Sequence, residues 1–275
     1  MSYPHQQWHL LITPPAPGAW NMAVDEALLE AVEGKQQSAM LRLYAWDPPC
    51  ISLGYAQPSA DIDLVRLYDQ GWDWVRRPTG GRAILHTDEL TYSLIAPLSD
   101  PRLVGGVLES YQRLSLALLK ALHSLDIPAE THPTYISAGN RVGEPVCFEV
   151  PSNYEIVIQG KKIIGSAQAR RKDAVLQHGT FPLCGDLTRI TQALAFEGER
   201  ERQQAATRLL AHATTAEMAA GKIISWQEAA QAFISAFQSE LNLDLVPVEL
   251  SARDSQRANE LVRDKYADPS WLGRI

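Results

Sequence analysis

The 275-residue sequence is poor in the features that mark several large classes of protein. It has three cysteines, Cys50, Cys147 and Cys184, whose number and irregular spacing argue against a disulfide framework and against a thiolate zinc site. No apolar run approaches the roughly 20 residues that cross a bilayer, and the first residues lack the basic and apolar regions of a signal peptide. These absences predict a protein of the reducing cytoplasm that makes no membrane contact.

Positive charge is also scarce. The formal net charge is −7, which disfavours a nucleic-acid partner because such binding needs a broad basic surface. Neither GxxxxGK[ST] nor a strand-linked GxGxxG occurs, and no spacing of His, Cys, Asp or Glu indicates a metal site. Basic residues do gather over residues 76–82 and 161–172, where they either attract an acidic partner or are scattered solvated charges.

The most informative stretch is residues 75–95, which read VRRPTGGRAILHTDELTYSLI. An aromatic and β-branched run ends there, two arginines follow, and Gly80-Gly81 permits positive φ angles and a close backbone approach to a ligand. We interpret the stretch as a glycine-rich hairpin that presents backbone N–H and guanidinium groups to a carboxylate, a phosphate or a thioester carbonyl. The alternative is an ordinary hairpin with a charged rim.

Strand patterns dominate up to about residue 183 and helical patterns follow, which favours an α+β fold over alternating βαβ units. Asn21 is the expected N-cap of a helix over residues 21–32. Ser225 and Glu228 have the spacing of a capping box at the start of a later helix.

Cys147 and Lys162 are the candidate catalytic residues. Cys147 lies between the aperiodic residues 124–144 and a strand, where backbone N–H groups can remain free for a ligand. A nearby lysine favours the thiolate, because lowering a thiol pKa of about 8.5 by ~1.5 units raises its ionisation at pH 7 from about 3% to about half. The alternatives are a buried, inert cysteine and an exposed hairpin lysine. His86 and His178 are either general bases or hydrogen-bond partners at a sheet edge.

Three motifs resemble those of the lipoate and octanoate attachment family, which is related to the biotin protein ligases. They are GAWNMAVDEALL (residues 18–29), RRPTGGRAILH (residues 76–86) and GKKIIGSAQ (residues 160–168). Within the family the chain is most similar to the LipM-type octanoyltransferases, which carry RRPTGGRA, LH and ELTYS, and a cysteine in a CFxxPSxYE context, matched here at Cys147. ATP-using lipoate ligases usually have a third glycine where this chain has Arg82.

The resemblance implies a fold and a set of site residues. The fold is α+β, with a class II synthetase or biotin protein ligase-like mixed, largely antiparallel sheet flanked by helices. A catalytic domain is expected over residues 1–245, with a C-terminal helical tail over residues 246–275 packed on the same domain. Cys147 and Lys162 are the implied catalytic pair. The implied substrate-binding residues are Arg76, Thr79, Gly80, Gly81, Arg82, His86, Gly165, Ser166, Ala167 and His178.

The implied reaction moves an octanoyl group from octanoyl-acyl carrier protein to a specific lysine of a lipoyl domain, such as that of the glycine cleavage H protein. Cys147 would hold the octanoyl group as a thioester, and no cofactor, metal or ATP is required. This is the first step of endogenous lipoate biosynthesis, carried out by a cytoplasmic acyltransferase. The alternatives are an ATP-dependent lipoate–protein ligase, a lipoyl amidotransferase and a catalytically silent acyl-binding relative.

Overall fold

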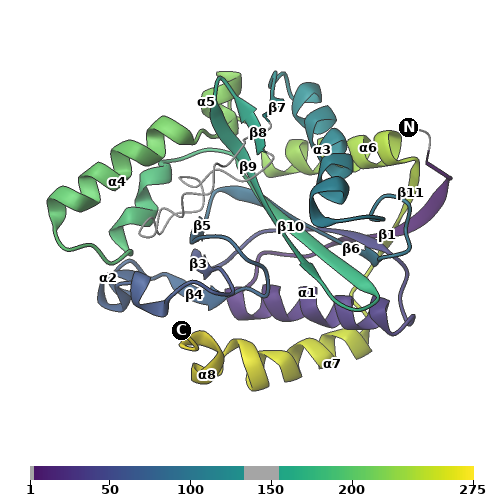
Figure 1. Ribbon diagram of the computed structural model, residues 1–275, viewed down its shortest axis with the longest axis horizontal. Helices are drawn as coiled ribbons and strands as arrows, with labels where there is room; N and C mark the ends of the chain where they lie inside the picture. Colours follow the sequence, from purple (N-terminus) through teal and green to yellow (C-terminus); the bar gives the residue numbers. More distant parts are fainter. Residues whose placement is uncertain (1–2, 133–154) are drawn as a thin grey trace.

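The computed structural model describes residues 3–132 and 155–275, and one large sheet forms its centre (Figure 1). Eight strands lie in the order β11-β1-β2-β6-β10-β9-β8-β7. β1 runs parallel to both of its neighbours, and the other neighbouring pairs are antiparallel. This confirms the predicted mixed, largely antiparallel sheet. The strands are β1 (Gln6–Ile12), β2 (Met40–Tyr44), β6 (Glu89–Pro97), β7 (Glu130–His132), β8 (Glu155–Ile158), β9 (Lys161–Arg170), β10 (Ala174–Pro182) and β11 (Leu243–Val248).

A second sheet of three strands carries the glycine-rich stretch. In it β3 (Cys50–Leu53) lies between β4 (Asp73–Arg76), which is parallel to it, and β5 (Ile84–His86), which is antiparallel. The predicted hairpin is therefore wrong. Because β3 separates β4 from β5, residues 77–83 form a connection that passes the end of β3 instead of a turn between paired strands.

Helices cover both faces of the large sheet (Figure 1). α1 (Gly18–Glu33) and α7 (Ala252–Leu261) pack together on one face, and α3 (Val107–Ser124) and α6 (Trp226–Leu241) pack together on the other. The central strands are buried along almost their whole length, as expected for strands covered on both sides. The other helices that precede β11 are η1 (Ser59–Asp61), α2 (Leu64–Asp69), η3 (Leu187–Gln192), α4 (Glu199–His212) and α5 (Ala216–Ala220).

Of the two helix starts predicted from the sequence, one is confirmed and the other is wrong. Ser225 and Glu228 form the predicted capping box at the start of α6. Asn21 is not an N-cap, because α1 begins earlier, at Gly18, directly after the proline-rich turn. Its amide instead donates to two backbone carbonyls at 3.0 Å each, and so fastens the helix to the preceding turn and to the segment after β2.

The end of the chain returns to its beginning. β11 pairs with β1, and α7 lies along α1. The π-helical turn η4 (Val262–Tyr266) and α8 (Pro269–Leu272) follow, and α8 reaches β4 of the small sheet. The division into a catalytic domain over residues 1–245 and a tail over residues 246–275 stays a prediction, and β11 runs across that boundary.

Candidate active site

A cavity lies where the small sheet and α1 meet the central strands of the large sheet. Its wall combines apolar side chains with hydroxyl, imidazole and guanidinium groups that come from both sheets. Mostly apolar surface with a few converging polar groups is typical of small-molecule sites. The cavity is lined by Met22, Tyr44, Trp46, Ser52, Arg77, Gly81, Ile84, His86, Thr91, Gly165, Ser166, Ala167, His178, Gly179 and Thr180.

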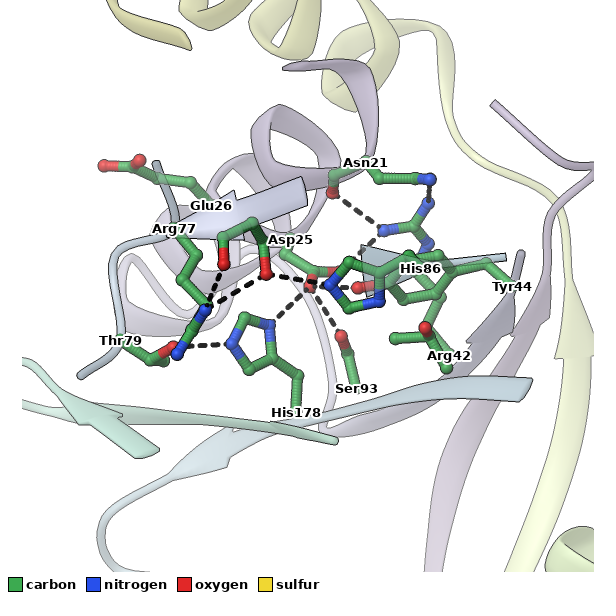
Figure 2. Close-up of polar contacts among 12 residues, drawn as sticks. Asn21, Asp25, Glu26, Arg42, Tyr44, Arg77, Thr79, His86, Ser93 and His178 are labelled. Atoms are coloured by element: carbon green, nitrogen blue, oxygen red, sulfur yellow. Dashed lines mark hydrogen bonds and ion pairs between the residues drawn. The ribbon is translucent and has the colours of Figure 1, made fainter. Parts of the chain in front are cut away.

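Asp25, on α1, is the fully buried centre of a polar cluster beside the cavity (Figure 2). Its carboxylate accepts hydrogen bonds from Arg42 Nη1 at 2.6 Å, the Tyr44 hydroxyl at 3.0 Å and the Ser93 hydroxyl at 2.6 Å. Burial raises the pKa of Asp25, but the Arg42 charge and hydrogen bonds from His178 and Ser93 outweigh burial and lower it. Asp25 is therefore ionised at neutral pH, and Arg42 compensates its charge.

His178, on β10, connects this cluster to the glycine-rich stretch (Figure 2). Its Nδ1 lies 3.4 Å from the Asp25 carboxylate, and its Nε2 lies 2.6 Å from Thr79 Oγ1. Because an ionised carboxylate only accepts, Nδ1 carries the proton and Nε2 accepts from the Thr79 hydroxyl. Burial lowers the pKa of His178 and outweighs the opposing effect of Asp25, so the imidazole is neutral.

His86, at the end of β5, is held by a second carboxylate. Its Nδ1 lies 2.7 Å from Glu89 Oε1, and its Nε2 lies 2.8 Å from Ser52 Oγ on β3. The ring also stacks on Trp46, with centroids 3.9 Å apart and planes inclined by 13°. These three contacts fix the orientation of the His86 ring relative to the cavity.

Arg77 shapes the glycine-rich connection. Its guanidinium donates to the carbonyl oxygens of Ser52 (2.7 Å), Gly80 (2.8 and 3.2 Å) and Arg82 (2.8 Å), and to Ser52 Oγ at 3.0 Å. Carbonyls on both sides of Gly81 thus converge on one buried cation. The charge of Arg77 is therefore directed into the protein, where it organises the backbone around the cavity.

The end of β3 touches the glycine-rich connection backbone to backbone. A Cβ on Gly54 would stand 2.0 Å from the carbonyl oxygen of Gly81, closer than any real contact. Gly81 itself has a φ of +96°, in the region that favours glycine. Both glycines are therefore required by the local geometry, the first for space and the second for conformation.

Arg76 faces away from the cavity. It is fully buried, and its guanidinium donates to the carbonyls of Gly54 (2.9 Å), Gln57 (2.5 Å) and Leu272 (2.7 Å), while the Trp271 indole donates to the Arg76 carbonyl at 2.9 Å. These contacts give Arg76 a structural role, which is to fasten the C-terminal helix α8 to the small sheet. Arg76 is not among the residues that line the cavity, and its contact with substrate stays a prediction.

Lys162 lies near the start of β9, outside the cavity lining. Its ammonium forms a buried ion pair with Glu155 on β8, with Nζ and Oε1 2.8 Å apart. Cys147 falls outside the described residues, so the predicted proximity of Cys147 and Lys162 stays a prediction. The segment that carries Cys147 re-enters the described structure at Glu155, the residue that Lys162 contacts.

Most of the predicted substrate-binding residues come together. Thr79 reaches the cavity through its bond to His178, Gly80 supplies carbonyl contacts to Arg77, and Arg82 is half-buried and does not line the cavity. The predicted residues that line the cavity are Gly81, His86, Gly165, Ser166, Ala167 and His178. Residues that sequence reasoning missed are Asp25, Arg42, Tyr44, Trp46, Ser52 and Glu89.

Two of the missed acids left a signal in the sequence. Asp25 lies three residues after Met22 and three before Leu28, so it occupies the apolar face of α1, where an unpaired charge is costly. Glu89 follows His86 at a spacing of three. Within residues 3–132 and 155–275, no group of three or more His, Cys, Asp or Glu side chains is arranged to hold a metal ion. No helix in the same ranges has both the length and the apolar character needed to cross a membrane.

Comparison with known proteins identifies the family. Residues 17–238 match the model of the lipoyl protein ligase A/B catalytic domain. Octanoyltransferase LipM of Brevibacillus brevis is 38% identical over 271 residues, which cover 97% of this chain and 98% of that protein. Octanoyltransferase LipM of Moorella thermoacetica is 39% identical over 278 residues, which cover 98% of this chain and 99% of that protein.

Solved structures of lower sequence identity show the same fold. The bipartite lipoate protein ligase of Thermoplasma acidophilum superposes with a TM-score of 0.82 at 23% identity, over 98% of each chain. A lipoate-protein ligase A bound with ATP gives a TM-score of 0.78, also at 23% identity, over 98% of this chain and 100% of that one. The full-length matches above 35% identity decide the family. The chain belongs to the octanoyltransferase LipM family of acyltransferases, built on the lipoyl protein ligase A/B catalytic domain.

Proposed function

We propose that this chain transfers an octanoyl group from octanoyl-acyl carrier protein to a specific lysine of a lipoyl domain, such as that of the glycine cleavage H protein. The observation that carries the proposal is the full-length similarity to proteins named octanoyltransferase LipM. The transfer would be the first step of endogenous lipoate biosynthesis in the cytoplasm. Neither a metal nor ATP takes part.

The cavity supports an acyl substrate. Met22, Tyr44, Trp46, Ile84 and Ala167 supply apolar surface to a chain of methylene groups. An octanoyl tail offers about seven carbons at ~0.8 kcal/mol each, so complete burial contributes at most roughly 5–6 kcal/mol. That free energy is enough to hold the chain while leaving the product free to dissociate.

The transfer would proceed in two steps through Cys147. The Cys147 thiolate attacks the thioester carbonyl of the carrier, a new C–S bond forms, and the carrier leaves as a thiolate that takes up a proton. The neutral amine of the acceptor lysine then attacks the acyl-enzyme and forms the amide. The C–S bond breaks, and the proton that the amine loses is taken up by the departing Cys147 thiolate. Lys162 would lie near the carbonyl, where its charge favours the thiolate and orients the acyl group. Glu155 holds the Lys162 ammonium in place through their ion pair.

Intact mass spectrometry tests this proposal. The wild type and the Cys147→Ala variant are incubated with octanoyl carrier protein in the absence of ATP. A hydroxylamine-labile octanoyl adduct on the wild type alone is the expected result, followed by transfer to an added lipoyl domain. Transfer that appears only with ATP and free acid would support an ATP-dependent lipoate–protein ligase. Transfer from an already modified lipoyl domain, but not from the carrier, would support a lipoyl amidotransferase.

A further inference from the structure

Glu89 directs hydroxyl protons away from the cavity. Its buried carboxylate accepts hydrogen bonds from the hydroxyls of Thr91 and Thr180 and from His86 Nδ1. Thr91 in turn accepts from the Trp46 indole at 2.8 Å. Since each hydroxyl has one proton, both threonines that line the cavity face it with oxygen lone pairs.

Ser52 follows the same rule. In the tautomer whose Nδ1 donates to Glu89, Nε2 of His86 accepts the Ser52 proton. Ser52, His86 and Glu89 thus have the spacing of a hydrolytic triad, but Arg77 donates to Ser52 Oγ at 3.0 Å and occupies one of its two lone pairs. The remaining lone pair is the group that Ser52 can offer to a ligand.

Apart from Ser166, the other side-chain donors around the cavity are engaged within the protein. The five N–H groups of Arg77 are taken by four bonds to backbone carbonyls and one to Ser52 Oγ. The Tyr44 hydroxyl donates to Asp25, and both ring nitrogens of His178 have partners. Ser166 shares a bond with the Tyr92 hydroxyl on the opposite face of the sheet, and either oxygen of that pair can donate.

Thr180 is the clearest acceptor that remains. Its side chain is almost fully buried, it lines the cavity, and its one proton goes to Glu89. Among residues 3–132 and 155–275, no donor is bonded to Thr180 Oγ1, so both of its lone pairs are available. A buried acceptor gains a hydrogen bond when a donor arrives and is repelled by another acceptor.

We propose that the cavity recognises medium-chain acyl groups that carry a hydrogen-bond donor, and that it discriminates against the same chain with a keto or carboxylate oxygen at that carbon. A hydroxylated octanoyl group is the substrate class that fits best. The hydroxyl donates to Thr180 Oγ1 or Ser52 Oγ, whereas a keto oxygen meets lone pairs. This inference rests on the proposed function, because it assumes that the cavity holds the acyl chain.

The sheet register indicates where on the chain the hydroxyl belongs. Thr180 pairs with Gly165, which lies three residues after Lys162 along β9. At ~3.3 Å per residue this separation is roughly 10 Å. With the acyl carbonyl beside Lys162, as proposed, Thr180 lies nearest the methyl end of an extended octanoyl chain.

Binding measurements test the inference without requiring turnover. Titration calorimetry of the full chain compares methyl esters of octanoic acid that bear either a hydroxyl or a keto oxygen at the same carbon. Each carbon of the methyl-terminal half is tested in turn. At one carbon or more we expect the hydroxy ester to bind about tenfold more tightly than its keto partner, the effect of one added hydrogen bond.

Variants assign the effect to Thr180. Thr180→Val keeps the shape and removes the oxygen, so the preference at that carbon should fall to about twofold or less. Thr191→Val is the matched control, because it makes the same change at a buried threonine of η3 that does not line the cavity. Its preference should equal that of the wild type.

The inference would be overturned if the wild type bound the hydroxy and keto esters equally at every carbon. It would also be overturned if Thr180→Val kept the wild-type preference for the hydroxy ester. The wild-type comparison decides by itself if Thr180→Val fails to fold. The octanoyl adduct on Cys147 is measured separately. An adduct without hydroxyl preference refutes only this inference, and a preference without an adduct refutes only the proposed function.

Discussion

Replacing Arg42 by methionine tests whether a buried charge pair holds the site together. Arg42 is fully buried on β2, and its guanidinium contacts Asp25 at 2.6 Å and two oxygens of Asn21 at 3.0 and 2.8 Å. Methionine fills much of the same volume but leaves the Asp25 carboxylate without its cation. Breaking a buried pair in this way costs about 3–5 kcal/mol of unfolding free energy.

The loss depends on pH in a defined direction. In the wild type the pKa of Asp25 is lowered, so its contribution to stability is present above the unfolded pKa of about 3.9 and is lost as pH falls through the folded pKa. In Arg42→Met, burial without a cation raises the folded pKa. The variant then loses stability as pH rises from the unfolded pKa through the folded one. The difference between the two proteins is therefore largest near neutral pH and shrinks toward about pH 4.

Urea unfolding followed by tryptophan fluorescence at several pH values measures this difference. Arg257→Met is the matched control, because Arg257 pairs with Glu30 at 2.7 Å at the surface, where such a pair contributes about 0–1 kcal/mol. The double variant Arg42→Met/Asp25→Asn should recover part of the loss, since it removes the unpaired charge. A loss below about 1 kcal/mol at neutral pH, or one that grows as pH falls, would refute the reasoning.

Three further predictions follow from the same contacts. Arg76→Met should cost about 2–3 kcal/mol and release the C-terminal helix, seen as faster limited proteolysis after residue 265, because buried carbonyls lose a charged donor. Gly54→Ala should lower thermal stability and slow acylation more than Gly198→Ala does, since a Cβ on Gly54 meets Gly81 and one on Gly198 meets nothing within 4 Å. Lys162→Met should lower the rate of Cys147 alkylation at pH 7 by about tenfold, and unchanged alkylation would remove its assigned role.

The sequence predicted those parts of the site that lie in continuous motifs. His86 and Gly165 each belong to such a motif, and the two sheets bring both to one cavity together with His178. The choice between Arg76 and Arg77 could not be made in the same way. Successive side chains near a strand end point to opposite sides, and only the structure shows that Arg77 faces the cavity and Arg76 faces α8.

The buried acids were missed for a related reason. A polar residue on the apolar face of a helix indicates a partner, but the partner of Asp25 is Arg42, on a strand that follows after a long turn. Glu89 was visible as a neighbour of His86, yet its two threonine donors come from β6 and β10. Contacts of this kind depend on strand order, which no local pattern specifies.

Strand register also explains why there is a cavity. Two rows of paired residues cross the sheet from β6 through β10 to β9, and β9 contributes the smallest side chain to each row. The rows are Thr91, Thr180 and Gly165, and then Ser93, His178 and Ala167. Glu89 binds the hydroxyls of the first row, and Asp25 binds the polar groups of the second. Asp25 and Glu89 thus fix the orientation of these polar groups, and the small side chains of Gly165 and Ala167 leave space beside them. Gly165 and Ala167 therefore keep this part of the cavity open, and larger residues at either position would fill it.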